Sequence, residues 1–226
     1  MDFQHRLQRS FKPRFAIIYP FGLFFLIFGS ITDQSLRAGI GYIIAGLLIR
    51  LWSNGYAIKN EKLTCSGPYA FVRNPLYLGT FLIAVGFAFA LRINSLSMGY
   101  LVGPLFLIAL VFMYYKTIKS EQKMLLEKFG GSYKNYCAKV PSMIPCLIPY
   151  SEGDQWPFSL ERLIFSKEYK SLVWITIIII VFTLKTHLLL AHKPMTEKTW
   201  GLVLLVALLI MMDVFYEISK KKTKKI

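Results

Sequence analysis

The sequence has little acidic charge, little cysteine and few charged residues of any kind. Of its 226 residues, 17% are charged and 55% are hydrophobic, whereas a soluble domain usually carries about 25% charged residues. Its three cysteines, Cys65, Cys137 and Cys146, form no CxxC pair and no even-numbered set, which argues against a zinc site or a disulfide scaffold. This composition also excludes a disordered chain and a collagen-like fibre. A membrane protein with reduced thiols is indicated, and a water-soluble enzyme is not.

What the sequence does contain is long apolar segments. Six of them are predicted to be transmembrane helices: 14–31, 36–56, 75–91, 95–117, 171–191 and 199–217. Basic residues before the first segment resemble the start of a signal peptide. No small-residue cleavage site follows them, so we expect the first helix to be retained. The predicted fold class is therefore all-α, a polytopic transmembrane helical bundle of about six helices.

Basic residues are distributed unevenly along the chain. Lys and Arg number 27 against 12 Asp and Glu, and 21 of the 27 lie in the N-terminus, the 57–74 loop, the 116–170 stretch and the C-terminal tail. The positive-inside rule places these segments, and hence both termini, in the cytoplasm. In a membrane protein, the lysine-rich tail favours contact with anionic membrane lipids, not with nucleic acid.

A turn motif separates the second and third apolar segments. Residues 67–79 read GPYAFVRNPLYLG, so Arg73 and Asn74 stand directly before Pro75, which can open a helix. A helix N-terminus has unpaired N–H groups and favours an anion, so an arginine beside it suits an anionic ligand. The alternative is an interfacial anchor made of this arginine and the motif tyrosines.

A second motif follows the fourth apolar segment. Residues 121–136 read EQKMLLEKFGGSYKNY, and Val140-Pro141 come shortly afterwards. Apolar residues keep a helical spacing up to Phe129, and Gly130-Gly131 is expected to end the helix. Three prolines between 141 and 149 then predict an extended path back along the membrane.

Together the two motifs resemble the isoprenylcysteine carboxyl methyltransferase family and its relatives, the phospholipid N-methyltransferases. In these membrane enzymes a GPY-x-x-V-R-H-P-x-Y-x-G turn precedes an E-E-x-x-L-x-x-x-F-G-x-x-Y-x-x-Y element and a V-P-R sequence. The resemblance covers about residues 40–149. Three positions depart from the family pattern, with Asn74 in place of histidine, Gln122 in place of glutamate and Ser142 in place of arginine.

The resemblance implies a methyltransferase that uses S-adenosylmethionine and no metal, with a cytoplasmic cofactor-binding element after the fourth helix. It implies a lipophilic or lipidated acceptor and, since the motifs are of the bacterial type, a bacterial inner membrane. The implied catalytic residues are Arg73, Asn74 and Arg50. The implied cofactor-binding residues are Gly67, Pro68, Tyr69, Pro75, Tyr77, Gly79, Glu121, Tyr133 and Tyr136. We expect Arg73 to hold a carboxylate and Glu121 to hold the cofactor's amine or ribose.

Arg50 lies inside the second predicted helix, near its cytoplasmic end. Charges within a membrane usually face a cavity or a partner, and Glu121 is the candidate partner; the alternative is that Arg50 snorkels to the interface. We divide the chain into a methyltransferase core, 1–150, and a C-terminal part, 151–226. The second part holds a cytoplasmic connector, two further transmembrane helices and the basic tail.

The sequence leaves the acceptor open between two chemistries. A carboxylate, as in isoprenylcysteine carboxyl O-methylation, is already a nucleophile at neutral pH. An amine, as in phosphatidylethanolamine, must first lose a proton and needs a base, so the lack of histidine at position 74 favours the carboxylate. The alternative from another enzyme class is an NADPH-dependent membrane sterol or lipid reductase, which cofactor binding would distinguish.

Overall fold

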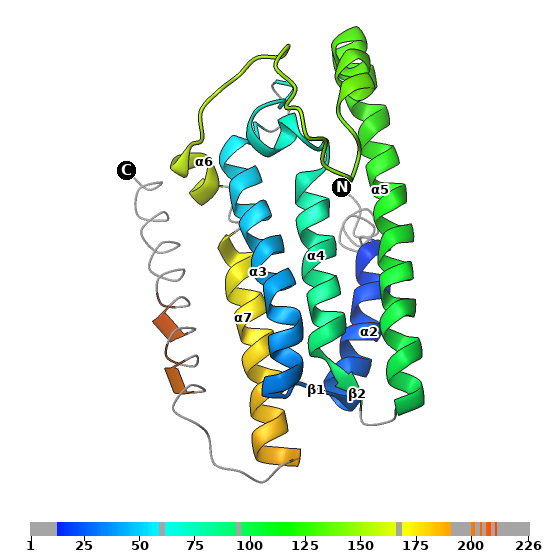
Figure 1. The fold of residues 1–226 in the computed structure, drawn as a ribbon, viewed down its shortest axis with the longest axis vertical. Coiled ribbons are helices and arrows are strands. Elements are labelled where there is room, and N and C mark those ends of the chain that lie inside the picture. Colours follow the sequence, from blue (N-terminus) through cyan, green and yellow to red (C-terminus); the bar gives the residue numbers. More distant parts are fainter. Residues whose placement is uncertain are drawn as a thin grey trace, which may run out of the picture.

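The computed structural model describes residues 13–58, 62–93, 96–165 and 169–190, and the separate positions 200, 201, 204, 207, 208 and 211. In chain order the elements are α2 (Pro13–Phe28), β1 (Gly29–Ser30), α3 (Asp33–Tyr56), the 3-10 turn η1 (Gly67–Ala70), α4 (Pro75–Ala90), β2 (Arg92–Ile93), α5 (Leu96–Lys139), α6 (Leu160–Phe165), α7 (Tyr169–Leu184) and the π-helix η2 (Lys185–Leu190). The long helices run along one common direction as a bundle (Figure 1).

The helices follow the predicted apolar segments. Within the described residues, three helices are long and apolar enough to cross a membrane: Asp33–Tyr56, Leu101–Lys139 and Lys170–Leu188. α4 is apolar but only 16 residues long. In the sixth predicted segment, 199–217, the few described positions are helical, and the rest of that segment and the lysine tail lie outside the described residues. The chain is thus a mostly helical integral membrane protein.

The structure corrects the all-α prediction at one small point. β1 and β2 form a short antiparallel pair, with Gly29 opposite Ile93 and Ser30 opposite Arg92. The pair joins the ends of α2 and α4 that lie farthest from η1 (Figure 1). These strand hydrogen bonds satisfy backbone groups next to the two helix ends, where helical partners run out.

α5 continues well past the predicted end of the fourth apolar segment at 117. It reaches Lys139, but Gly130 interrupts it with φ 51° and ψ −119°, a conformation that residues with a Cβ atom rarely adopt. The predicted end of the helix at Gly130-Gly131 is therefore a kink, after which the chain is helical again. As a result the second motif lies on a helix that extends directly from a membrane span.

α3 and α4 pack against each other through glycines. A Cβ atom on Gly39 would lie 2.1 Å from the carbonyl oxygen of Gly86, and one on Gly46 would lie 2.4 Å from that of Gly79. Residues without a side chain let the two backbones approach closely, as is common between transmembrane helices. This contact fixes the orientation of α4. Arg73 and Asn74 directly precede Pro75, the first residue of α4.

The long connections gather at one end of the bundle, around η1 (Figure 1). The connector after residue 150 packs onto the C-terminal end of α3, where Ser159 N and Arg162 Nε both donate to the carbonyl oxygen of Gly55 at 2.9 and 3.0 Å. α6 is therefore tied to the same end of the bundle as the two sequence motifs.

Candidate functional site

The two sequence motifs lie against each other at the η1 end of the bundle. The 140–150 loop runs beside the 70–73 backbone through three hydrogen bonds of 2.9 Å, from Arg73 N to Pro141 O, from Cys146 N to Phe71 O and from Tyr150 N to Ala70 O. The prolines of this loop keep it extended. Motifs more than 40 residues apart in sequence thus form one structural unit.

A cavity of about 330 Å³ opens between α4, α5 and the 140–150 loop. We call it the polar cavity, because seven of its lining residues carry polar or charged groups: Arg73, Tyr77, Tyr114, Tyr115, Lys119, Gln122 and Ser142. The remaining lining comes from apolar and aromatic side chains of α4 and α5 and from Met143. The volume is at the lower end of the range of small-molecule sites, about 300–1,000 Å³.

Arg73 is the cation at the centre of this arrangement. Its Nη1 donates to Cys137 Sγ at 2.7 Å, and its Nε is buried without a hydrogen-bond partner among the described residues. A buried donor left without a partner costs about 1–3 kcal/mol. Arg73 also lines the polar cavity, so its guanidinium offers a positive charge to an anionic ligand there.

Tyr77 and Glu121 form the second polar contact of the site. The Tyr77 hydroxyl donates to Glu121 Oε1 at 2.6 Å, which joins the first turn of α4 to α5. Tyr77 lines the polar cavity and its ring lies 5.1 Å from that of Tyr114. Glu121 is not among the lining residues, so it is one hydrogen bond removed from the cavity.

Asn74 holds the 140–150 loop in place. Its Nδ2 donates to both the carbonyl oxygen and the hydroxyl of Ser142, each at 3.0 Å, and its side chain does not cap α4. Ser142 in turn lines the polar cavity together with Gln122. Two of the three positions that depart from the family pattern therefore face the cavity, and the third contacts one of them.

Several of the other predicted site residues stabilise the turn. Tyr136 donates its hydroxyl proton to the carbonyl oxygen of Tyr69 at 2.6 Å, and Tyr133 and Tyr136 are both buried in an apolar cluster. Gly67 has φ +59°, and a Cβ there would lie 2.6 Å from the Tyr56 ring. Pro68 is buried in η1. None of these five residues is among those that line the polar cavity.

Arg50 of α3 and Gly79 of α4 lie at the contact between these two helices. Arg50 Nη1 donates to Thr80 Oγ1 at 2.5 Å and to the carbonyl oxygen of Leu76 at 3.3 Å. A Cβ on Gly79 would lie 2.7 Å from Arg50 Cγ, so glycine gives the arginine its space. Pro75 is buried at the first turn of α4. The structure thus connects Arg50 to Thr80 and Leu76 of α4, and Glu121 to Tyr77.

Sequence reasoning missed most of the α5 side of the cavity. Lys119 and Gln122 project from one face of α5 together with Tyr114, Tyr115 and Ile118. The helical spacing of these residues, at steps of three and four from 115 to 122, could have revealed this face.

Cys65 precedes η1 in the chain and is buried in the apolar cluster with Tyr133, Tyr136 and Val140. Burial, and secondarily the charge of Asp154, raises the pKa of the Cys65 thiol to about 12. The thiol stays neutral at physiological pH and acts as an apolar packing group. All three cysteines are free, as predicted.

An apolar groove continues from the polar cavity along the membrane-embedded part of α5. It shares Phe81, Val111 and Tyr115 with the cavity, and its remaining lining consists of Leu107, Ile108 and Phe112. We call it the α4–α5 groove. A ligand in the polar cavity can therefore have an apolar part that reaches the lipid.

The chain was compared with known proteins. A model of the phospholipid methyltransferase family matches residues 19–132. Over 92 residues, 40% of this chain and 36% of the relative, the chain is 36% identical to protein-S-isoprenylcysteine O-methyltransferase from Schizosaccharomyces pombe. The match thus spans little more than a third of that relative's own length. No solved structure matches the chain.

Two further relatives are named for metal resistance. The cobalt-zinc-cadmium resistance protein CzcN of Cupriavidus metallidurans is 25% identical over 167 residues, 70% of this chain and 73% of the relative. The nickel-cobalt-cadmium resistance protein NccN of Alcaligenes xylosoxydans xylosoxydans is 26% identical over 119 residues, 52% and 53% of the two chains. In the described part of this chain, no three His, Cys, Asp or Glu residues are grouped to hold a metal ion.

Proposed function

Because the chain belongs to the phospholipid methyltransferase family, we propose that it transfers a methyl group from S-adenosylmethionine to a lipophilic acceptor. The observation that carries the proposal is the polar cavity, which is lined by residues from both sequence motifs and continues into the apolar α4–α5 groove. A polar reacting group and an apolar chain can occupy such a site together.

The polar cavity suits S-adenosylmethionine. Arg73 lines the polar cavity, and a carboxylate, such as that of the methionine part, would pair with its guanidinium. Tyr77 and Tyr114 offer aromatic faces, which attract a positively charged sulfonium. The bound cofactor would supply an electrophilic methyl group on that sulfur.

The chain's own residues would act mainly by alignment. Tyr77, fixed by Glu121, and Arg73, fixed by Cys137, hold the walls at the N-terminal end of α4 in one geometry. Methyl transfer is a direct displacement, and correct placement of the reactants can contribute roughly 7–11 kcal/mol to lowering such a barrier. The aromatic and apolar side chains of α4 and α5 would exclude water from the reacting atoms.

A carboxylate acceptor fits the cavity better than an amine acceptor. Two of its lining residues, Arg73 and Lys119, are cations, and none of the described lining residues is an aspartate, glutamate or histidine. With Arg73 paired to the carboxylate of the cofactor, Lys119 supplies a second positive charge, which attracts an acceptor carboxylate and repels an acceptor ammonium group. An amine would also need a base, and Glu121, one hydrogen bond away from the cavity, already accepts a hydrogen bond from the Tyr77 hydroxyl. We therefore favour isoprenylcysteine-like carboxyl O-methylation.

We also propose that the η1 end faces the cytoplasm of a bacterial cell. Of the 27 lysines and arginines, 21 lie in the N-terminus, the 57–74 loop, the 116–170 stretch and the tail, and the positive-inside rule places these segments in the cytoplasm. The catalytic core would then be residues 1–150, with 151–226 as an addition. Single cysteines at positions 4 and 222 should react with a membrane-impermeant maleimide only after permeabilisation, and labelling of intact cells would reverse the orientation.

The function is tested by a methyl-transfer assay. Membranes containing the protein are incubated with methyl-labelled S-adenosylmethionine, and the lipid extract is treated with base. Label released as methanol indicates an ester and supports the carboxylate acceptor, whereas base-stable label in lipid indicates N-methylation. If the purified protein binds NADPH and not S-adenosylmethionine in isothermal titration, the reductase alternative replaces the proposal.

A further inference from the structure

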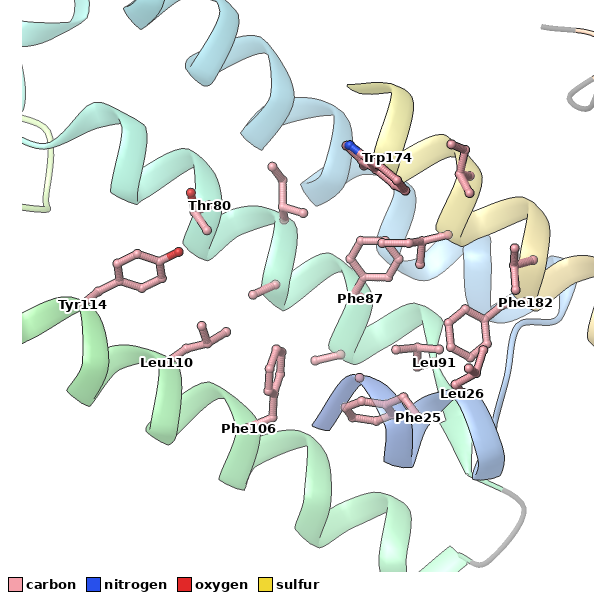
Figure 2. A pocket seen from close by; sticks show the side chains of 17 residues that line it. Phe25, Leu26, Thr80, Phe87, Leu91, Phe106, Leu110, Tyr114, Trp174 and Phe182 are labelled. Atoms are coloured by element: carbon pink, nitrogen blue, oxygen red, sulfur yellow. The ribbon is translucent and has the colours of Figure 1, made fainter. Parts of the chain in front are cut away.

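A second cavity lies among α2, α4, α5 and α7, all of which contribute lining residues. Its volume is about 420 Å³, and Figure 2 shows its wall of large apolar side chains. Among its lining residues, only Thr80, Tyr114 and Trp174 carry a polar side-chain atom. Thr80 and Tyr114 lie together at one end, while Leu91 and Phe182 lie at the other (Figure 2). We call it the α4–α7 cavity.

The way α7 is attached explains why this cavity exists. At the η1 end, Arg50 Nη2 reaches Ser171 Oγ at 3.5 Å. At the far end, Lys185 Nζ donates to the carbonyl oxygens of residues 26, 27 and 29 at 2.8, 2.7 and 2.8 Å. Between these two attachments, Trp174 and Phe182 face α4 across the empty space (Figure 2).

Small residues keep the cavity open. Ala84 and Ala88 on α4 and Gly22 on α2 all line it, and a Cβ on Gly22 would meet no atom within 4 Å. An apolar space of this size does not hold ordered water, because water needs several polar partners. Its natural occupant is therefore hydrocarbon.

The length of the cavity and its polar end limit which hydrocarbon molecule can occupy it. From Thr80 to Leu91 the helix rises by about 16 Å, close to half of the roughly 30 Å hydrocarbon core of a bilayer. This matches one acyl chain from the leaflet at the η1 end. Arg50, bonded to Thr80, and Lys170, one helical turn before Trp174, place two cations at that same end.

We propose that the α4–α7 cavity binds one acyl chain of an anionic membrane phospholipid, with its headgroup beside Arg50 and Lys170. The lipid fills the gap beneath a helix that is held at its two ends, and so stabilises α7 against the core. α7 lies beyond residues 19–132, the part matched by the family model, so the additional C-terminal part of the chain supplies one wall of this site and the matched part supplies the others. The site is separate from the polar cavity, since the two share only Tyr114 among their lining residues.

The test uses the purified full chain in detergent, with phosphatidylglycerol or phosphatidylcholine of identical chains added as probes. Phosphatidylglycerol should raise the melting temperature by roughly 5 °C when it is well above its dissociation constant, and native mass spectrometry should detect one retained molecule. Ala88→Phe fills the cavity and should abolish both effects. Ala45→Phe, on the exposed face of α3, is the matched control and should keep them.

Lys170→Gln tests the contact with the lipid headgroup separately from the contact with the acyl chain. It should remove the preference for phosphatidylglycerol over phosphatidylcholine while one lipid is still retained. Because Phe at position 88 occupies a space that is otherwise empty, that variant should melt no lower than the wild type without lipid, which shows that it folds. A melting temperature below the wild type, or equal lipid effects in Ala88→Phe and Ala45→Phe, would overturn the proposal. Loss of methyl transfer in Ala88→Phe with phospholipid retention unchanged would also overturn it, because the cavity would then belong to the acceptor.

Discussion

The two cavities along α4 are built in different ways. The walls of the polar cavity are fixed by individual hydrogen bonds, from Arg73 to Cys137 and from Tyr77 to Glu121. The α4–α7 cavity is defined by volume. Its α7 wall is hydrogen-bonded near both ends and packs in between through buried apolar residues such as Ile179. A single polar substitution should therefore damage the first cavity severely, whereas the second should respond to changes in size and attachment.

The largest effect is expected at Arg73. Arg73→Ala should lower methyl transfer by about a hundredfold, because a charged partner of a carboxylate is lost. Arg73→Lys keeps the charge but not the two-pronged geometry, so its rate should lie between the two. Initial rates and detergent-extracted yield are measured together. Arg37→Ala, at an exposed position of α3, serves as the control, and a near-normal rate in Arg73→Ala would remove Arg73 from the site.

A smaller effect is expected for the Tyr77–Glu121 pair. Tyr77→Phe and Glu121→Gln should each weaken S-adenosylmethionine binding by about tenfold. Because the two side chains share one hydrogen bond of 2.6 Å, the double variant should lose less than the product of the two single losses. Isothermal titration of the four proteins completes the cycle. Fully independent losses would mean that the pair does not act as a unit.

Substitution of Lys185 tests how α7, one wall of the α4–α7 cavity, is attached to the end of α2. Lys185→Met leaves the three carbonyl oxygens without their charged donor, so the melting temperature should fall by about 3–5 °C. Methyl transfer at temperatures below the transition should be unchanged, since the polar cavity is at the opposite end of α4. Lys123→Met on the exposed part of α5 is the control. A loss of rate without a loss of stability would show that the two cavities are coupled.

The smallest effect is expected at Cys65, whose thiol should not react in the folded protein. Its thiol pKa is raised from the ordinary value of 9.0 to about 12, so at pH 9 the native thiol is neutral and iodoacetamide should not modify it. In the unfolded chain the same thiol ionises near pH 9, and the difference should lower stability as the pH rises above that value. Mass spectrometry of labelled peptides, with and without denaturant, measures both states. Equal labelling in the two would contradict the buried position.

The helices were predicted well because their cause is local. A run of apolar residues long enough for a bilayer is visible in α3 and α7 without any knowledge of their neighbours. The two-residue strands β1 and β2 were missed, since such short segments carry no periodicity. The α5 helix was predicted as far as Phe129, and its last part up to Lys139 was missed, because two successive glycines usually end a helix.

The roles of the site residues stay predictions. Arg73 and Tyr77 line the polar cavity, and the two motifs lie against each other. Tyr69 and Tyr136 match the family motif equally well, yet they hold the turn together. A motif does not separate residues that fix the backbone from residues that face a ligand. Lys119 escaped notice because its position on the cavity depends on the rotation of α5.

The sequence by itself determined that the chain is a helical membrane protein with two motifs that belong together, because hydropathy, charge bias and residue spacing are properties of neighbouring residues. Only the tertiary structure decided where the cavities lie. The polar cavity requires Tyr77 of α4, Lys119 of α5 and Ser142 of the loop to meet, and the α4–α7 cavity requires α7 to be held away from α4 between its two attachments. Both depend on helix faces brought together from distant parts of the chain, and no local pattern specifies that geometry.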